Sequence, residues 1–368
     1  MKEGERDTIL ILVATSGDTG KAALEGFADA EGIRIMVFYP DGGVSPVQRL
    51  QMVTQAGENV AVVAVRGNFD DAQRGVKEIF GDAAMVQELA ALHTKLSSAN
   101  SINWGRLVPQ IVYYFSAYAD LLAEKKIATG DAVNFTVPTG NFGNILAGYY
   151  AKRMGLPVGK LVCASNANNV LTDFLQTGIY DRKREFCQTI SPSMDILVSS
   201  NLERLLYHLT EDTAQVAAWM RELAENGTYD ASGLLPVLRE NFWAAFISDM
   251  MTEEEIRIVC ERTSYTLDTH TAVAYRVAED YRCETGDMRP MIVLSTASPY
   301  KFGESVLQAL GKDTDGLDEF TLMERLHKRS GMPIPPRLAA LRTAPVRHKE
   351  VCEKDGMRDA VLDFARSV

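Results

Sequence analysis

The stretch ILILVATSGDTG, residues 9–20, joins an apolar run to a turn that contains two glycines. An unbroken apolar run of this kind is typical of a parallel strand that is covered on both faces. The turn opens a segment of helical periodicity, so the free N–H groups of a helix start would meet the hydroxyls of Ser16 and Thr19 there. The stretch therefore predicts a strand, an anion-binding turn and a helix, the beginning of an α/β domain.

The same alternation of apolar runs and helical segments continues along the chain. It predicts two α/β domains with doubly wound parallel sheets, a smaller one over residues 1–97 and a larger one over 98–310. A helical insertion is expected near 199–264 and a C-terminal tail over 311–368. We expect strands at residues 9–15, 33–39, 59–65, 133–137, 161–165 and 291–294, and helices at 19–30, 46–55, 70–80, 144–154 and 302–310.

The composition narrows the class of ligand. Among 368 residues, 46% are hydrophobic and 24% charged, as in an ordinary globular protein, and the net charge of −11 disfavours nucleic acid and anionic membranes as partners. The five cysteines form no CxxC pair, which predicts neither a metal site nor a disulfide framework and favours the reducing cytoplasm. The N-terminal residues have no signal-peptide pattern, and the apolar run is too short to span a bilayer. We therefore expect a small-molecule ligand.

The first turn leaves two interpretations open. It can bind an anion, or Ser16 or Asp18 can simply cap the helix. A nucleotide-hydrolysing P-loop is excluded because Ala22 follows Lys21 where Ser or Thr would bind magnesium, and because Thr15 stands in the place of the first glycine.

A second turn, PTGNFGN over residues 138–144, also lies between a predicted strand and a predicted helix. Its glycines and asparagines favour a backbone nest that encloses a phosphate group. Dinucleotide binding is disfavoured because the glycine spacing is GxxG and because the next strand ends in Ser165-Asn166 rather than in an acidic residue. A plain tight connection remains the alternative.

A third segment, LSTASP over residues 294–299, carries hydroxyls at the end of a predicted strand. In open α/β sheets ligands bind at this edge, and a Thr or Ser hydroxyl can hydrogen-bond a neutral ring nitrogen without protonating it. A polar strand terminus without a ligand is the alternative.

These segments together resemble threonine synthase, a pyridoxal-phosphate enzyme family with the tryptophan-synthase-β fold, in its enterobacterial and fungal branch. The resemblance runs from about Ile9 to about Leu310. It rests on ordered motifs at residues 14–20, 45–48, 98–103, 138–144, 268–273 and 295–297.

The resemblance implies a fold-type II architecture and pyridoxal 5'-phosphate (PLP) as the cofactor. It implies that Thr296 faces the pyridine nitrogen and that the cofactor phosphate is held by Gly140, Asn141, Phe142, Gly143 and Asn144. It also implies conversion of O-phosphohomoserine and water to threonine and phosphate. The substrate's carboxylate and phosphate would be bound by Ser16, Gly17, Asp18, Thr19, Asn100, Ser101 and Arg106, since an arginine fork can donate two hydrogen bonds to a phosphate.

One family feature has no counterpart in residues 1–368. The Schiff-base lysine of the family lies upstream of the first turn, in a Phe-Lys-Asp context at a helix start, and no such segment is present here. Lys21, Lys95 and Lys301 do not fit its place. We therefore expect no catalytic residue in this chain, negligible turnover and a missing N-terminal segment, whose loss would expose apolar surface and favour self-association.

Two hypotheses of different classes follow. The favoured one is a partial threonine synthase, and the alternative is a binding protein that holds PLP or a phosphorylated amino acid without chemistry. A dehydratase acting on another amino acid is disfavoured by the asparagine-rich segment 100–103. We interpret His270 as a hydrogen-bonded histidine at a helix start rather than as an acid or base.

Overall fold

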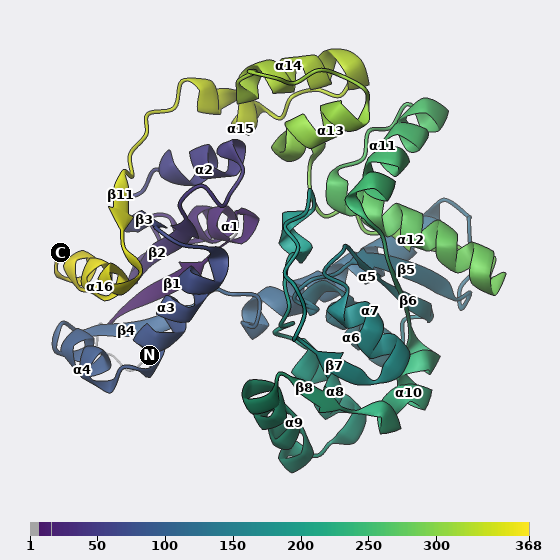
Figure 1. Cartoon of the computed structure of the whole chain (residues 1–368), viewed down its shortest axis with the longest axis horizontal. Helices are drawn as coiled ribbons and strands as arrows, with labels where there is room; N and C mark the ends of the chain where they lie inside the picture. Colours follow the sequence, from purple (N-terminus) through teal and green to yellow (C-terminus); the bar gives the residue numbers. More distant parts are fainter. Residues whose placement is uncertain (1–6, 16, 368) are drawn as a thin grey trace. The chain divides into compact units, whose positions relative to one another are not determined.

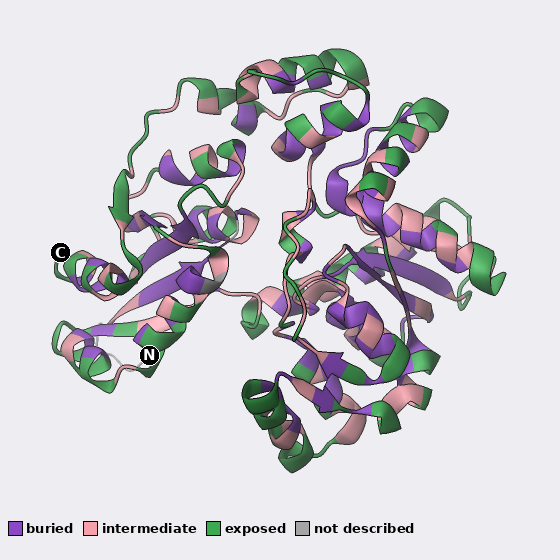
Figure 2. Ribbon diagram, in the orientation of Figure 1, coloured by how far each residue is buried: buried purple, intermediate pink, exposed green. Residues whose placement is uncertain are grey.

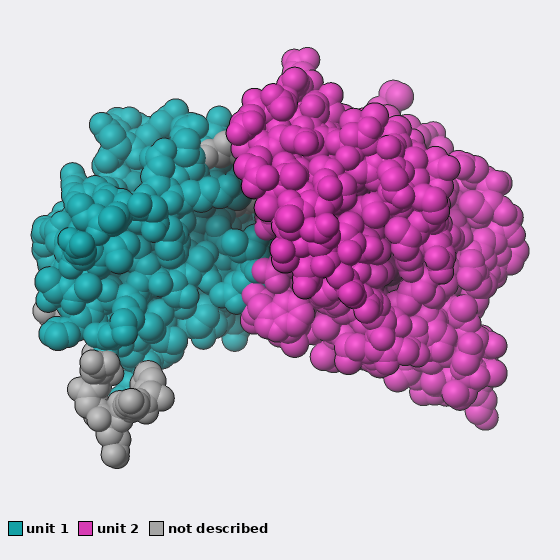
Figure 3. Space-filling view, turned by 90° about the horizontal axis from the view of Figure 1, so that it is seen from below, with its two compact units in different colours: residues 1–103, 333–368 teal, residues 104–332 magenta. Residues whose placement is uncertain are grey.

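The computed structural model describes residues 7–15 and 17–367 and divides into two compact units (Figure 3). The first comprises the chain up to Asn103 together with the segment from Pro333 onward, and the second is Trp104–Met332. The boundaries predicted from the sequence are instead at residues 97 and 310. Ser16 lies outside the described residues.

The first unit is built on a five-stranded parallel sheet, in the order β11-β3-β2-β1-β4 (Figure 1). Its strands are β1 (Thr8–Ala14), β2 (Ile33–Pro40), β3 (Val60–Val65), β4 (Thr94–Ser98) and β11 (Glu350–Cys352). Its helices are α1 (Asp18–Phe27), α2 (Pro46–Val53), α3 (Phe69–Gly81), α4 (Ala83–Ala91), α15 (Pro336–Ala339) and α16 (Met357–Arg366).

Both faces of this sheet are covered, as the unbroken apolar runs predict. In β1, Leu10 and Leu12 belong to a buried cluster with residues of α3, α4 and α16, whereas Ile11 and Val13 belong to another cluster with residues of α1 and α2. Successive side chains of a strand point to opposite faces, so a strand buried on both sides needs apolar residues at every position. Figure 2 shows the resulting buried strands.

The C-terminal segment does not behave as a tail. Glu350–Cys352 forms β11, which pairs in parallel with β3, and Val361 and Leu362 of α16 are buried in the core beneath the sheet. The prediction of a tail over 311–368 rested on the abundance of proline and arginine near residues 333–337. That composition describes the connection, while the apolar positions of α16 follow a helical period and bury one face.

The second unit is built on a four-stranded parallel sheet, in the order β10-β5-β6-β9. Its strands are β5 (Val133–Pro138), β6 (Val158–Ser165), β9 (Phe242–Phe246) and β10 (Met291–Val293), with β7 (Ile179–Asp181) and β8 (Thr228–Asp230) in a separate antiparallel pair. The helices are α5 (Trp104–Ala123), α6 (Gly143–Arg153), α7 (Val170–Thr177), α8 (Leu202–Thr210), α9 (Thr213–Asn226), α10 (Leu235–Asn241), α11 (Asp249–Thr263), α12 (Thr269–Thr285), α13 (Gly303–Ala309) and α14 (Glu319–Ser330).

Two cores again lie on opposite faces of the sheet. Leu161 and Cys163 of β6 pack with α5, α6 and α7, and the intervening Val162 and Ala164 pack with α12. Within the described residues, no helix is both long and apolar enough to cross a membrane.

The expectation of a purely helical insertion near 199–264 is wrong in one respect. Residues 228–230 form β8, and residues 242–246 form β9, an edge strand of the main sheet. The run FWAAF is short, apolar and flanked by helices, so periodicity alone does not distinguish it from a helical segment. The region contributes to the sheet rather than standing outside it.

Candidate cofactor-binding site

The second and third predicted segments lie at the same edge of the sheet. β10 pairs in parallel with β5, with Val293 opposite Thr136, and the Leu294 N–H donates to the Thr136 carbonyl at 3.0 Å. Because parallel strands end at a common edge, the turn that follows β5 and the residues that follow β10 emerge side by side. The strand pairing therefore brings the Gly140–Asn144 turn and Thr296 to one edge, and Thr296 is exposed there.

The Gly140–Asn144 turn presents a row of backbone donors. Phe142 adopts a left-handed conformation with φ of 60° and directly precedes α6, whose start carries no side-chain cap. Among the described residues, none accepts a hydrogen bond from the N–H groups of Asn141 through Ile145. Consecutive free N–H groups around a left-handed residue at a helix start form an anion-binding nest. The residues present thus fit a phosphate group.

The carbonyls of this turn are held on its other side by the segment before α8. The Ser199 hydroxyl donates to the Gly140 carbonyl at 2.9 Å, and the Asn201 side-chain amide donates to the Asn141 carbonyl at 2.9 Å. In addition, the Tyr114 hydroxyl donates to the Asn144 carbonyl at 2.7 Å. These bonds occupy the acceptors and leave the donors of the turn available. These three residues are not among those predicted for the site, since their polar character is the only signal that the sequence gives.

A neutral thiol lies below the turn. Cys163 of β6 is opposite Val137 in the sheet and fully buried. Burial raises the pKa of Cys163 to about 12. A thiol with this pKa adds no negative charge beneath an anion site at neutral pH.

The first predicted turn, in the other unit, is organised by Thr15. The Thr15 hydroxyl accepts hydrogen bonds from the N–H groups of Gly17 and Gly20, both at 2.9 Å. Gly17 has φ of 139°, a backbone conformation in which any other residue is strained, and a Cβ on it would also displace the Gln48 side chain, 2.4 Å away. Gln48 in turn donates to the Asp18 carboxylate at 3.1 Å. Ser16 and Asp18 are the caps predicted from the sequence, and Thr15 is not among the predicted residues.

The remaining predicted substrate residues are divided between the units. Asn100 and Ser101 belong to the first unit, where the Asn100 N–H donates to the Ser98 hydroxyl at 3.2 Å. Arg106 lies in the first turn of α5, in the second unit. Each is described within its own unit, and binding of a common ligand by all three stays a prediction.

The three lysines named above are distributed over both units. Lys21 forms an ion pair with Glu25 at 2.7 Å, and Lys95 forms one with Asp7 at 2.5 Å, both in the first unit. Lys301 lies in the short 3-10 helix Pro299–Phe302 of the second unit.

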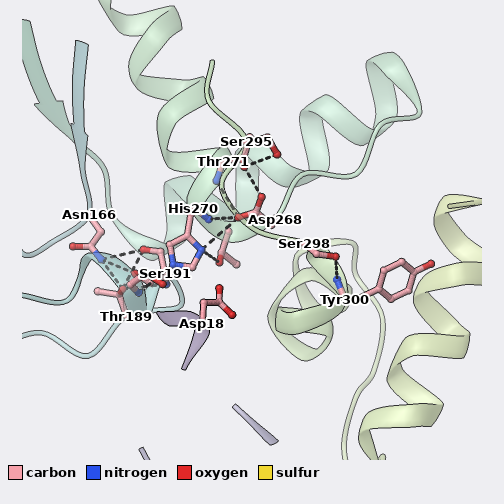
Figure 4. Close-up of polar contacts among 12 residues, drawn as sticks. Asp18, Asn166, Thr189, Ser191, Asp268, His270, Thr271, Ser295, Ser298 and Tyr300 are labelled. Carbon is pink, nitrogen blue, oxygen red and sulfur yellow. Dashed lines mark hydrogen bonds and ion pairs between the residues drawn. The ribbon is translucent and has the colours of Figure 1, made fainter. Parts of the chain in front are cut away.

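His270 is located at a helix start, as predicted. It is the second residue of α12, and the N-cap Asp268 accepts hydrogen bonds from the backbone N–H groups of His270 at 2.9 Å and Thr271 at 3.1 Å. All three side chains are buried. Figure 4 shows this cluster together with Ser295, which directly precedes Thr296.

Comparison with known proteins gives consistent matches over most of the chain. A family model described as pyridoxal-phosphate dependent enzyme matches residues 1–235, and one described as the C-terminal part of threonine synthase matches residues 271–361. The threonine synthase of Saccharomyces cerevisiae is 38% identical over 90% of this chain, and a protein named threonine synthase-like 1 from Macaca fascicularis is 45% identical over 82%.

Solved structures agree with these matches. The crystal structure of PLP-bound threonine synthase from Brucella melitensis is 37% identical, with a TM-score of 0.83 over 98% of this chain and 72% of that chain. The alignment with the yeast protein covers 66% of its length, and the alignment with the macaque protein covers 41%. This chain therefore spans only part of the length of the curated relatives that it matches.

Proposed function

Because this chain belongs to the threonine synthase family of pyridoxal-phosphate-dependent enzymes, we propose that residues 1–368 carry the PLP-binding site and the substrate-binding residues of such an enzyme. The observation that carries the proposal is the row of free N–H groups from Asn141 to Ile145, at the same sheet edge as Thr296. When it is bound, PLP acts as an electron sink for the removal of protons from an amino acid.

The chain's own residues have distinct tasks in this proposal. The N–H groups of Gly140–Asn144 donate to the cofactor phosphate, and the positive end of α6 stabilises its charge. The Thr296 hydroxyl hydrogen-bonds the pyridine nitrogen without protonating it. The support for these tasks is the geometry of the two strand ends, which expose donors and a hydroxyl along one edge.

We further propose O-phosphohomoserine as the substrate and threonine and phosphate as the products. The residues that would bind the substrate are Ser16–Thr19, Asn100, Ser101 and Arg106. A guanidinium can donate two parallel hydrogen bonds to a phosphate, which suits Arg106 to the leaving group. These assignments come from the family resemblance, residue by residue.

The Schiff-base lysine of the family has no counterpart among residues 1–368. We therefore propose that these residues capture PLP without a covalent bond and that they produce negligible threonine by themselves. The non-catalytic alternative, a binder of PLP or of a phosphorylated amino acid, uses the same phosphate cup, the Gly140–Asn144 turn. Only the partial enzyme should form threonine from O-phosphohomoserine once a segment that carries the family's Schiff-base lysine is supplied.

The experiment that tests the proposal compares PLP with pyridoxal, which lacks the phosphate. Equilibrium dialysis should show PLP bound at least about tenfold more tightly, because several charge-assisted hydrogen bonds to phosphate are each worth about 1.5 to 3 kcal/mol. Equal affinities would contradict the phosphate cup. Borohydride treatment followed by mass spectrometry should leave the chain's mass unchanged, and a pyridoxyl adduct on a single lysine would overturn the statement that no lysine here serves. Threonine formation from O-phosphohomoserine by these residues alone would do the same.

A further inference from the structure

The start of α12 lies buried between two segments that lead to the proposed cofactor contacts. Asp268, His270 and Thr271 are each at most 3% exposed, and the helix they begin packs against the main sheet of the second unit. Their side chains extend in two directions, toward the end of β10 and toward the 3-10 helix η1 (Pro192–Met194) (Figure 4).

Thr271 reaches the end of β10. Its hydroxyl donates to the Asp268 carboxylate and also hydrogen-bonds the Ser295 hydroxyl, with 3.3 Å between Thr271 Oγ1 and Ser295 Oγ. Ser295 directly precedes Thr296. β10 is a three-residue strand at the edge of the sheet, and its half-exposed residues offer little packing to hold its end in place. The Thr271 hydroxyl is therefore a lateral anchor for the residue that would face the pyridine ring.

His270 reaches the segment that covers the phosphate turn. Its Nε2 accepts the Ser193 N–H at 3.1 Å, and an imidazole nitrogen that accepts a hydrogen bond carries no proton. The ring proton is then on Nδ1, which faces the Asp268 carboxylate at 3.4 Å. The Asp268 carboxylate thus selects the tautomer that lets Nε2 accept.

The Ser193 peptide in turn packs directly on Gly140. A Cβ at Gly140 would lie 2.8 Å from the Ser193 carbonyl oxygen and 3.2 Å from Met194 Cα. The same segment is held at its far end by Asp195, which accepts hydrogen bonds at 2.8 Å from both Asn166 and Thr189. A shift of Ser193 would therefore be transmitted to the first residue of the phosphate turn.

We propose that Asp268, His270 and Thr271 are positioning residues for cofactor binding, with separate effects on the two ends of the cofactor. His270 positions the turn that would bind the cofactor phosphate, through the contact of Ser193 with Gly140. Thr271 positions Thr296, which would face the pyridine ring, through its hydrogen bond with Ser295. Asp268 holds both side chains in the required orientation. The inference rests on the proposed function, since it assigns the control of that same site.

The test measures the dissociation constants of PLP and pyridoxal by equilibrium dialysis for His270→Phe and Thr271→Val. His270→Phe removes the acceptor of Ser193 and should weaken PLP about tenfold with little change for pyridoxal. Thr271→Val is nearly isosteric and should weaken both ligands about threefold. Thr252→Val is the matched control, because Thr252 is equally buried in the same unit and its hydroxyl donates to the Ser248 carbonyl at 2.9 Å.

Four further variants complete the test. His270→Gln offers an acceptor at about the position of Nε2 and should restore PLP affinity, and Thr271→Ser should restore both ligands. Ser295→Ala changes an exposed residue and should reproduce Thr271→Val without affecting folding. His270→Leu serves as the acceptor-free variant if the phenyl ring prevents folding.

The outcomes distinguish a failure of the proposed PLP-binding function from a failure of the positioning role. If the unchanged chain binds PLP no better than pyridoxal, the proposed function fails. If the unchanged chain prefers PLP, but His270→Phe weakens both ligands equally and Thr252→Val does the same, the positioning role is overturned. A selective loss of PLP affinity that His270→Gln reverses supports it.

Discussion

The two predicted anion-binding turns, one in each unit, are built from similar sequences and differ in their free donors. Both follow a buried parallel strand, both contain glycines and both open a helix. In the first turn the Thr15 hydroxyl accepts from two backbone N–H groups, at Gly17 and Gly20. In the second, side chains bind the carbonyls of Gly140 and Asn141, and the N–H groups are left without a described acceptor.

This difference shows that glycines at a strand-to-helix turn do not by themselves define an anion site. What decides is whether neighbouring side chains bind the donors or the acceptors of the turn. The Thr15 hydroxyl occupies two N–H groups of the first turn. Ser199 and Asn201 instead occupy carbonyls of the second turn, so the N–H groups of that turn stay available. We infer that the second turn binds the more strongly charged group and that side chains carry more of the binding in the first.

The strongest test of this contrast places a carboxylate in the second turn. Gly143→Asp should weaken PLP about a hundredfold or more, since two like charges about 4 Å apart repel by about 4 kcal/mol at an effective dielectric constant of about 20. A Cβ at Gly143 meets only the Asn201 side chain, at 3.4 Å, so the new residue fits. Gly143→Asn is the neutral control of equal size, and equal losses for both variants in equilibrium dialysis would contradict a phosphate cup.

The complementary change removes the acceptor from the first turn. Thr15→Val leaves the N–H groups of Gly17 and Gly20 without their partner and should lower the free energy of unfolding by about 2 kcal/mol, measured by urea denaturation. PLP affinity should not change. Thr15→Ser keeps the hydroxyl and should retain most of the stability. A loss of PLP binding in Thr15→Val would show that the two turns are not independent.

A smaller effect on PLP affinity is expected when a hydrogen bond that holds the second turn is removed. Ser199→Ala removes the donor to the Gly140 carbonyl and should weaken PLP about threefold, because the turn loses one bond that orients it. Ser330→Ala provides a matched control, since the Ser330 hydroxyl also donates to a backbone carbonyl at 2.8 Å in the same unit. If the two variants bind PLP equally well, the hydrogen bond from Ser199 does not help to orient the N–H groups of the second turn for PLP.

The smallest expected effect concerns the thiol below the second turn. Because burial raises the pKa of Cys163 to about 12, this thiol should stay neutral and resist iodoacetamide at pH 8, whereas the exposed Cys283 should react. Peptide mapping of the native protein and of the protein in urea measures both sites. Alkylation of native Cys163 at the rate of Cys283 would indicate a charged or accessible group beneath the cup.

Much of the fold could be predicted from the sequence, because strands buried on both faces leave an unmistakable apolar run. The predicted strands at 9–15, 33–39 and 133–137 lie within a residue of β1, β2 and β5. The missed strand β4 has the sequence TKLSS and is largely half-buried, so it carries no such run. The strand β11 is a three-residue edge strand whose partner lies far away in sequence, and local pattern does not reveal such pairing.

The family, the fold type and the cofactor class that the resemblance implied are confirmed by the matches to pyridoxal-phosphate enzymes and threonine synthases. The resemblance implied that Gly140–Asn144 and Thr296 contact one cofactor, and the strand order, which the sequence could not reveal, places both at one edge of the sheet. Ser199 and Asn201 escaped prediction because their contacts with the turn cross about sixty residues of chain. The individual binding roles stay predictions until the variants are measured.

The pairing of β11 with β3 has a consequence for synthesis on the ribosome. Residues 104–332 are continuous, so the whole second unit is synthesised between residues 1–103 and the last strand of the first unit. Until residues 350–366 have been synthesised, residues up to 103 lack the strand that pairs with β3 and the helix that covers part of their core. During that interval the early strands are the part of the polypeptide most in need of a chaperone.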